Sequence, residues 1–257
     1  MSNRHGYTSI GGGNANFFTT QWSEIMSVRT SDQQRQEQTI NNLIEKYWKP
    51  VYCAIRRKGF SNEDSKDLTQ DFFEAIVLSK ELIQKADKAK GKFRTFLLTA
   101  LDHFIINANR KKNAKKRRPD GGVRSFQIQD ELDIPPDQHN MSAEEVFNYA
   151  WACELLEEVF KLVEIECKES DMQLHWKVFQ KKVVLPIIAG KPAPEMPEIC
   201  KKYNLKSPQK ASNMIVTVKR MFRRILESQL GKYAQDETGI TDEFNQLFQI
   251  LSRGGAS

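Results

Sequence analysis

Nine consecutive residues, from Arg110 to Arg118, carry the densest charge in this chain. Seven of them are Lys or Arg, and they follow directly on the apolar segment FIINAN. The chain has 257 residues and a formal net charge of +6, so this run of +7 leaves −1 for everything else. Like charges at this density repel one another unless an anionic partner neutralises them. The run therefore predicts a contact with a polyanion, and nucleic-acid phosphates have the matching chemistry.

A second basic stretch lies near the carboxyl end of the chain. Between Ile199 and Lys232 there are nine basic residues and one acid, Glu227. At 100° per residue, one side of residues 208–231 is apolar, and this stripe comprises Ala211, Met214, Ile215, Val218, Phe222 and Ile225. The other side begins with amide and hydroxyl groups and ends in cations, at Gln209, Ser212, Asn213, Val216, Arg220 and Arg223. Such an order suits base contacts first and phosphate contacts later along a helix. Most helices with this pattern simply have a solvated polar face, so the prediction of DNA binding depends on both basic stretches together.

Five acids at residues 63–74 raise the alternative of a metal-dependent nuclease. They are Glu63, Asp64, Asp67, Asp71 and Glu74. Two-metal chemistry needs carboxylates that converge on ions ~4 Å apart, whereas these acids spread along about three turns of one helix. The four histidines are scattered, and the four cysteines lie far apart without a C-x-x-C pair, which predicts reduced thiols. We therefore expect no enzyme activity, no catalytic residues, no metal site and no cofactor.

Helical periodicity dominates the elements that must position these residues. We expect a first helix at 36–58, followed by Gly59 as its cap. A second helix is expected from Ser61, with the buried stripe Leu68, Phe72 and Ile76. A third is expected from about Phe93, and its buried stripe comprises Phe93, Leu97, Ala100, Leu101, Phe104 and Ala108. The second half reopens at Ser142, whose spacing to Glu145 predicts a capping box. Further helices are expected from about Asp171, from about Pro197 to Asn204, from Ser207 as cap to Gly231, and from Thr241 or Asp242 as cap. The helix that ends at Asn204 and the helix that ends at Gly231 are joined by a short turn, and together they form a helix-turn-helix.

Composition divides the chain into two halves. Pro119, Gly121 and Gly122 stop the third helix, and the segment after them lacks helical periodicity. Residues 130–171 then hold thirteen acids and two bases. We expect an all-α fold of two small helical domains joined by a flexible linker. The predicted parts are a disordered lead (1–19), a first domain (20–118), a linker (119–141), a second domain (143–231), and a tail (232–257) whose amphipathic helix packs on the second domain.

The apolar segments exclude a membrane-spanning helix. The longest of them, such as VVLPIIAG, are far shorter than the ~20 residues that a bilayer helix needs. The amino-terminal segment has no apolar stretch that could serve as a signal peptide. We therefore expect a cytoplasmic protein that does not contact a membrane.

Several stretches resemble a known family. They are QWSEIM, YWKPVYCAIRRKGFSNEDSKDLTQDFF and GKFRTFLLTALDHFIINANRKKNAKKRR in the first half, and LPIIAGKP and NLKSPQKASNMIVTVKRMFRRIL in the second. Together they cover most of residues 20–118 and 143–231. The chain resembles the extracytoplasmic-function sigma factors of bacteria, most of all the sigma-like proteins of planctomycete-type bacteria. This class carries only the region 2 and region 4 domains of the sigma family.

The resemblance implies a role for each charged surface. The segment DLTQDFF is similar to the region 2 helix that docks on RNA polymerase, which implies contacts from Asp67, Gln70, Asp71 and Glu74. The segment around FIINAN resembles the part that melts the promoter and recognises its minus-ten element. This implies base or backbone contacts from His103, Asn107, Asn109 and Arg110, and phosphate contacts from Lys111, Lys112, Lys115, Lys116, Arg117 and Arg118. The first half has no run of exposed aromatic residues like that of primary sigma factors, which argues against strong independent melting.

The helix-turn-helix resembles region 4, which recognises the minus-thirty-five element and touches the polymerase flap. The implied DNA contacts are Gln209, Lys210, Ser212, Asn213, Val216, Lys219, Arg220 and Arg223. SPQKASN departs from the small residues usual after this turn, so no base preference is transferred.

The resemblance implies a sigma factor that binds core RNA polymerase and directs transcription initiation at promoter DNA. It leaves room for an anti-sigma factor as a further partner. The alternative is a free-standing helix-turn-helix regulator that never engages polymerase. Such a regulator would keep both basic stretches but would have no need of the acidic side of DLTQDFF.

Overall fold

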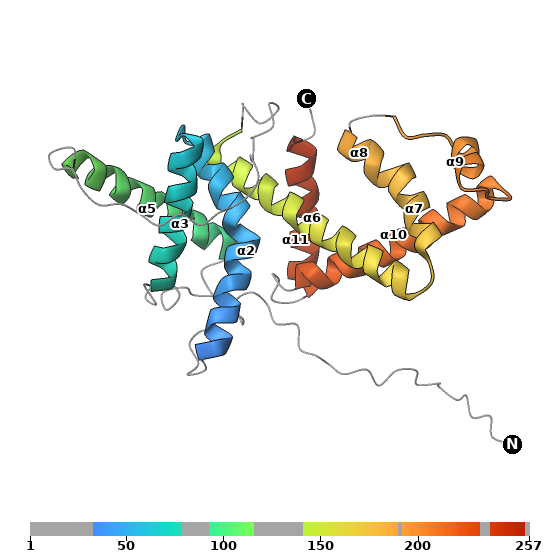
Figure 1. Ribbon diagram of the computed structural model, residues 1–257, viewed down its shortest axis with the longest axis horizontal. Coiled ribbons are helices and arrows are strands. Elements are labelled where there is room, and N and C mark those ends of the chain that lie inside the picture. Colours follow the sequence, from blue (N-terminus) through green and yellow to red (C-terminus); the bar gives the residue numbers. More distant parts are fainter. Residues whose placement is uncertain (1–32, 79–92, 116–140, 190–191, 232–236, 255–257) are drawn as a thin grey trace, which may run out of the picture.

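The computed structural model is helical, and its described residues contain no β-strand. It describes residues 33–78, 93–115, 141–189, 192–231 and 237–254, and Figure 1 shows their arrangement. The elements, with η3 denoting a π-helix, are α2 (Gln33–Arg57), α3 (Asn62–Leu78), α5 (Phe93–Lys115), α6 (Ala143–Glu169), α7 (Gln173–Phe179), η3 (Gln180–Val184), α8 (Leu185–Ala189), α9 (Met196–Lys202), α10 (Pro208–Gly231) and α11 (Glu237–Gly254). The predicted all-α class is confirmed for these residues.

Helices α2, α3 and α5 form what we call the first block. Val51 and Leu101 are fully buried in it, and the rings of Phe72 and Phe104 meet edge to face with their centroids 5.5 Å apart. Gly59, with a φ of +92°, adopts the left-handed conformation at the turn after α2, as a glycine cap requires. These contacts confirm that the predicted stripes of α3 and α5 face the core at Phe72, Leu101 and Phe104, while the side chain of Ile76 is not described. Ile105 is also buried, although it lies outside the predicted stripe.

Residues 141–189 and 192–231 form the second block, which begins with the predicted capping box. The backbone N–H of Glu145 donates to the Oγ of Ser142 over 3.2 Å, and the backbone N–H of Ser142 donates to the Glu145 carboxylate over 2.8 Å. Both orphan amides are thereby satisfied at the start of α6. The helix then runs unbroken for 27 residues, which corresponds to a length of about 40 Å.

Helices α9 and α10 form the predicted helix-turn-helix. Asn204 has a φ of +52° after α9, which is the left-handed conformation expected of it. The Oγ of Ser207 accepts a hydrogen bond from the backbone N–H of Lys210 over 3.3 Å and so caps α10. The buried face of α10 contains Ala211, Met214, Ile215, Val218 and Ile225, as predicted, and also Met221 and Leu226.

The two blocks share one continuous hydrophobic core. Helix α2 packs along the amino-terminal half of α6, where the rings of Tyr47 and Phe147 stack with centroids 6.2 Å apart. The Nζ of Lys49 forms an ion pair with Glu154 over 2.6 Å at the same interface. The carboxyl-terminal half of α6 packs on α7 and α10 instead, so α6 connects the blocks. The predicted linker lies outside the described residues except for Met141, and a flexible connection between two domains stays a prediction.

The structure departs from the sequence-based expectation at two helices. A π-helix, η3, separates α7 from α8, and its longer turn precedes Pro186, which has no N–H to donate within the helix. The tail helix was predicted to begin at Thr241 or Asp242, which is wrong because α11 begins at Glu237. Ile240 packs against the core, and this contact favours a helical conformation in the turn that precedes it.

Within the described residues, no helix combines the length and the apolar character needed to cross a membrane.

Candidate nucleic-acid interface

The predicted DNA-contacting residues of α10 lie together on its exposed side. Seven of them are exposed and Ser212 is half-buried, and the complete set is Gln209, Lys210, Ser212, Asn213, Val216, Lys219, Arg220 and Arg223. They are fixed in direction because the opposite side of the helix is buried in the second block. We call this set the α10 face. Its amino-terminal end carries amide and hydroxyl groups and the cation Lys210, and the rest of the face carries the cations Lys219, Arg220 and Arg223.

The cations of α10 differ in whether a nearby acid neutralises them. Arg223 donates from its Nε to Glu227 over 2.8 Å, and Arg224 forms a two-oxygen ion pair with Glu166 of α6. In contrast, neither Lys219 nor Arg220 forms an ion pair with any described residue. The cations of α10 without an acidic partner among the described residues therefore include Lys219 and Arg220 in its middle and Lys210 in its first turn, and Arg223 is partly occupied.

One wall of a groove is formed by part of the α10 face. The groove has a volume of about 690 Å³ and lies between α8, the start of α9 and α10. Ser212, Val216 and Lys219 line it on one side, and Ile187, which is 75% exposed, lines it on the other. An exposed apolar surface beside cations can contact both the apolar edges and the phosphates of a nucleic acid. Val216 was among the predicted contacts, whereas helical periodicity gave no sign of this groove.

The predicted contacts of α5 also share one exposed side. His103, Asn107 and Arg110 follow each other at helical spacing and are all exposed, and we call them the α5 face. Helix α5 continues to Lys115, so the first part of the basic run extends the core helix as predicted. The side chains of Asn109, Lys111, Lys112 and Lys115 are not described, and Lys116, Arg117 and Arg118 lie outside the described residues.

One further exposed residue on this side of α5, Ile106, was not among the predicted contacts. Ile106 is 49% exposed and adjoins Asn107. Ile106 directly follows the apolar residues Phe104 and Ile105, so it belongs to the same apolar segment of the sequence. Helical spacing nevertheless places it on the side of α5 away from Leu97 and Leu101. An apolar side chain among polar ones can pack on an unstacked base. The α5 face is therefore not purely electrostatic.

The acids of α3 form an exposed strip on the first block. Asp67, Asp71 and Glu74 are exposed, and Gln70 is half-buried and donates to Glu74 over 3.0 Å. Phe72 lies on the opposite, buried side of the helix. We call these four residues the acidic strip. The structure brings them together as predicted, on a helix whose other side is anchored in the core.

The three carboxylates of the acidic strip have no cationic partner among the described residues. None of them forms an ion pair with Asp67, Asp71 or Glu74. The partial loss of solvent around Asp71 raises the pKa of its carboxyl above the usual value, and the nearby carboxylates of Glu74 and Asp67 raise it further. Like charges at this helical spacing destabilise a helix slightly. A cationic partner surface would relieve that repulsion.

The nuclease alternative needs carboxylates that converge, and the structure does not bring them together. Across the described parts of the chain, no three His, Cys, Asp or Glu side chains meet in a way that could hold a metal ion. The acids of α3 instead line one exposed side of a helix. A row of this kind suits contact with a protein surface better than the coordination of two ions.

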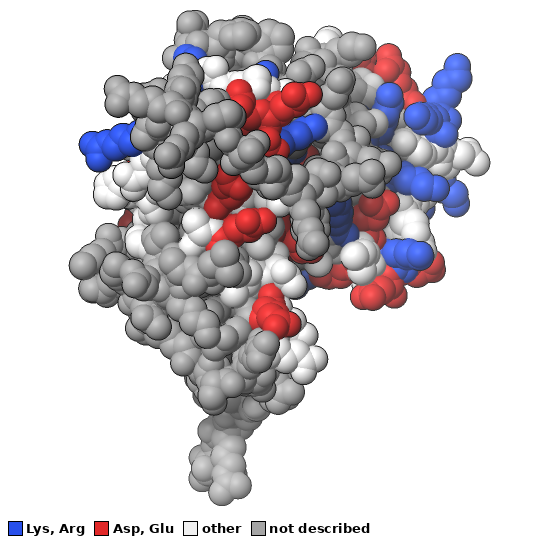
Figure 2. All heavy atoms as spheres, turned by 60° about the vertical axis from the view of Figure 1, so that its left-hand side comes forward, with Lys and Arg blue, Asp and Glu red and all other residues white. Residues whose placement is uncertain are grey.

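Charge is distributed unevenly over the surface of the molecule. Figure 2 shows several basic side chains along one edge, with acidic ones among them, and further acidic side chains over the middle of the face in view. In Figure 1 the carboxyl end of α5 and the α9 end of α10 lie toward opposite ends of the molecule's long axis. The α5 face and the α10 face are therefore separate surfaces, which suits a target with two spaced elements.

Comparisons with protein-family models, with curated proteins and with solved structures found no match to this chain.

Proposed function

We propose that this protein is an RNA polymerase sigma factor of the extracytoplasmic-function type, acting in the cytoplasm. It binds core polymerase and directs initiation at a promoter with two recognised elements. One observation carries the proposal. Two separate exposed faces that carry cations, Arg110 on α5 and Lys219 with Arg220 on α10, occur in the same packed body as exposed carboxylates on α3 that form no ion pair with a described residue.

The α10 face supplies the chemistry for recognition of the upstream element. Asn213 and Gln209 have carboxamides that can pair with base edges, and an amide can bond two groups of an adenine at once. Lys219 and Arg220 follow on the same side, where they can hold phosphates and set the register of the helix on the duplex. The α10 face thus combines sequence recognition with positioning.

The α5 face supplies the chemistry for the downstream element. Single-stranded DNA is bound by cations along its backbone together with groups that stack on or bond to unpaired bases. His103, Asn107 and Ile106 offer the second kind of contact, and Arg110 with the basic run after it offers the first. This side of the molecule suits DNA in which bases have become accessible.

The acidic strip distinguishes a sigma factor from a free-standing regulator. DNA repels carboxylates, so an unneutralised row of them contributes nothing to DNA binding. It would complement a basic surface on another protein, which in this proposal is the largest subunit of core polymerase.

The test is a binding assay between the purified chain and core RNA polymerase without other sigma factors. We expect a stable complex that survives gel filtration, followed by protection of one discrete promoter segment in a footprint. A chain that protects DNA equally with and without core polymerase, and does not co-elute with it, would be a free-standing regulator instead.

A further inference from the structure

A buried ion pair ties the tail helix α11 to the first block. Arg94, in the first turn of α5, is 149 residues away from its partner Glu243, and their side chains are only 7% and 3% exposed. The Nη1 of Arg94 lies 2.6 Å from a Glu243 oxygen. Its Nη2 donates to the side-chain carbonyl of Gln246, also over 2.6 Å. One guanidinium thus attaches two successive turns of α11 to α5.

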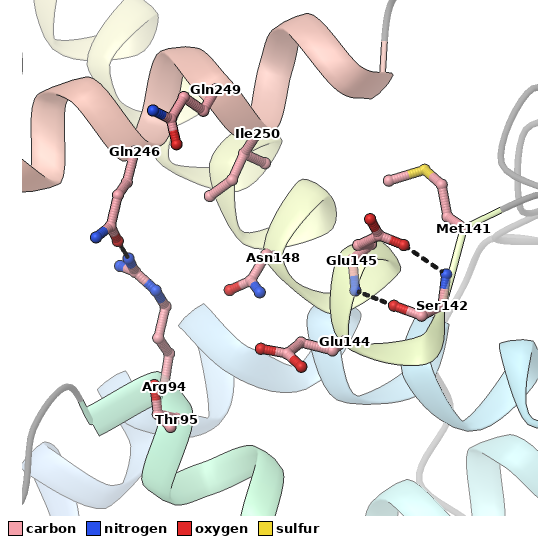
Figure 3. A pocket seen from close by; sticks show the side chains of 10 residues that line it. All are labelled: Arg94, Thr95, Met141, Ser142, Glu144, Glu145, Asn148, Gln246, Gln249 and Ile250. Carbon is pink, nitrogen blue, oxygen red and sulfur yellow. Dashed lines mark hydrogen bonds between the residues drawn. The ribbon is translucent and has the colours of Figure 1, made fainter.

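The same guanidinium also contacts the helix that joins the blocks. Its central carbon lies 4.3 Å from the centre of the Trp151 ring in α6, which places a cation over an aromatic face. Arg94 therefore links α5, the helix that carries it, to both α6 and α11. A polar cavity of about 690 Å³ lies beside the pair, lined in part by Thr95, Asn148 and Gln249. Figure 3 shows Arg94 pointing toward Gln246 beside this cavity.

The buried side of α11 also contacts the second block. Leu247 is 1% exposed, and Arg223 of α10 lies over the Phe244 ring at 5.9 Å. Helix α11 packs on both α6 and α10. It is thus held by α10 on one side and by α5 on another, next to the long helix α6 that the two blocks share.

Buried ion pairs contribute more to geometry than to stability. The loss of hydration offsets most of the attraction, and a planar guanidinium bonds a carboxylate well only in a narrow range of positions. An apolar contact would let α11 shift along its neighbours at little cost. Arg94 with Glu243 instead permits one register of α11 against α5.

We propose that α11 is a brace that fixes the α5 face relative to the α10 face, with Arg94 and Glu243 as positioning residues. The brace thereby sets the spacing between the two DNA elements that the chain can contact at once. This inference rests on the proposed function, because it assigns spacer specificity to the same two faces. It gives the tail helix a role in DNA selection without any DNA contact of its own.

The variants separate the charge pair from the packing around it. Arg94→Met and Glu243→Met each leave one buried charge without its partner, whereas the double variant removes both charges and keeps similar volume. Arg224→Met is the matched control, since it breaks an ion pair with Glu166 inside the second block. Circular dichroism first establishes that each variant is folded.

The measurements use the full chain, alone and as holoenzyme. For the chain alone, small-angle X-ray scattering compares the radius of gyration. For the holoenzyme, binding is measured on the promoter fragment that gives the strongest run-off transcript, with about five base pairs added to or removed from its spacer, half a turn of DNA. We expect wild type, the double variant and Arg224→Met to lose about tenfold in affinity on the altered spacers. Each single variant should lose less than about threefold and should have a larger radius.

The outcomes separate the brace from the proposed function. If the single variants keep the wild-type radius and spacer profile, the brace proposal is overturned. It is equally overturned if wild-type holoenzyme transcribes but tolerates every spacer. If no holoenzyme forms at all, the proposed function fails, and the claim of spacer control fails with it. The comparison of the radius of gyration by scattering then decides by itself whether Arg94 and Glu243 hold the two blocks together.

Discussion

Gln209 and Asn213 are joined by a hydrogen bond on the exposed side of α10, from the Nε2 of Gln209 to the Oδ1 of Asn213 over 3.0 Å. The bond holds the Asn213 carboxamide in one orientation near the amino end of the helix. An Asn that pairs with adenine needs its oxygen and its nitrogen together. Gln209 must therefore either release that oxygen or join it in contacting the DNA, and the two residues should act as a unit.

The first prediction concerns base recognition by this pair. We expect Asn213→Ala to weaken holoenzyme binding by roughly 1 to 3 kcal/mol on the matched promoter and much less on a scrambled one, as the loss of a base contact should. Gln209→Ala should change the effect of Asn213→Ala in a double-mutant cycle, because contacting residues are not additive. An equal loss on both DNAs would make the α10 face an electrostatic clamp without base recognition.

The second prediction concerns the unpaired cations of α10. Replacing Lys219 and Arg220 with Gln should weaken binding to matched and scrambled DNA alike. It should also make the salt dependence less steep, by about 0.9 in log–log slope for each lost phosphate contact. Arg224→Gln is the control, because Glu166 already occupies that guanidinium. The proposed phosphate contacts are wrong if the control and the double variant give the same slope.

The third prediction concerns the basic run at the end of α5. Replacing Lys115, Lys116, Arg117 and Arg118 with Ser should weaken all DNA similarly and flatten the salt dependence, since the loss is purely electrostatic. The measurement is a salt series of holoenzyme binding to two unrelated promoters. A loss confined to one promoter would mean that the run recognises sequence.

The fourth prediction concerns the acidic strip. Asp67→Arg with Glu74→Arg should weaken binding to core polymerase while leaving helicity unchanged, because both side chains are exposed. Glu164→Arg with Glu169→Arg makes the same change of charge on the exposed side of α6 and serves as the control. Equal affinity of both double variants for core polymerase would refute the docking surface.

The fifth prediction concerns a thiol at the interface between the blocks. Burial raises the pKa of Cys53 from its ordinary 9.0 to about 11. Since the thiolate is the reactive form, iodoacetamide at pH 8 should modify Cys53 roughly 100-fold more slowly in the folded chain than in guanidinium. The folded state also holds this proton more tightly, so the free energy of unfolding should fall as pH rises from 9 toward 11. Mass spectrometry follows the modification, and fast labelling of the folded chain would contradict this account.

Local structure was predictable from sequence where a short-range signal existed. The capping box of Ser142, the turn at Asn204 and the buried stripe of α10 each depend on residues within one or two turns, and each was confirmed. The exposed grouping of the acidic strip followed from helical spacing alone. These features are set by backbone hydrogen bonding and apolar periodicity, which a single sequence displays.

The contacts between distant segments were not predictable in this way. Arg94 lies beside the apolar stripe of α5, and its spacing gives no sign that it is buried against Glu243. The packing of α2 on α6 joins two segments that sequence composition had separated. The start of α11 at Glu237 likewise depends on Ile240 contacting the core. Each of these features is decided by tertiary packing, which local periodicity does not encode.

Proteolysis bears on how the two blocks are connected. A first cut between Pro119 and Asn140 is expected because that segment is rich in Gly and Pro and lacks helical periodicity. The resulting fragments should nevertheless co-elute in gel filtration, since α2 packs on α6 in a shared core. Fragments that separate immediately would show that the shared core is weak, and an initial cut within α6 would contradict the predicted boundary.

Run-off transcription with purified core RNA polymerase tests the central claim most directly. Core enzyme, the full chain and a library of genomic fragments are combined, with core enzyme alone as the control. The account predicts discrete transcripts that appear only with the chain and disappear with the Asp67→Arg and Glu74→Arg double variant. If transcripts are the same with and without the chain, while the chain still binds those fragments by itself, the protein is a DNA-binding regulator and not a sigma factor.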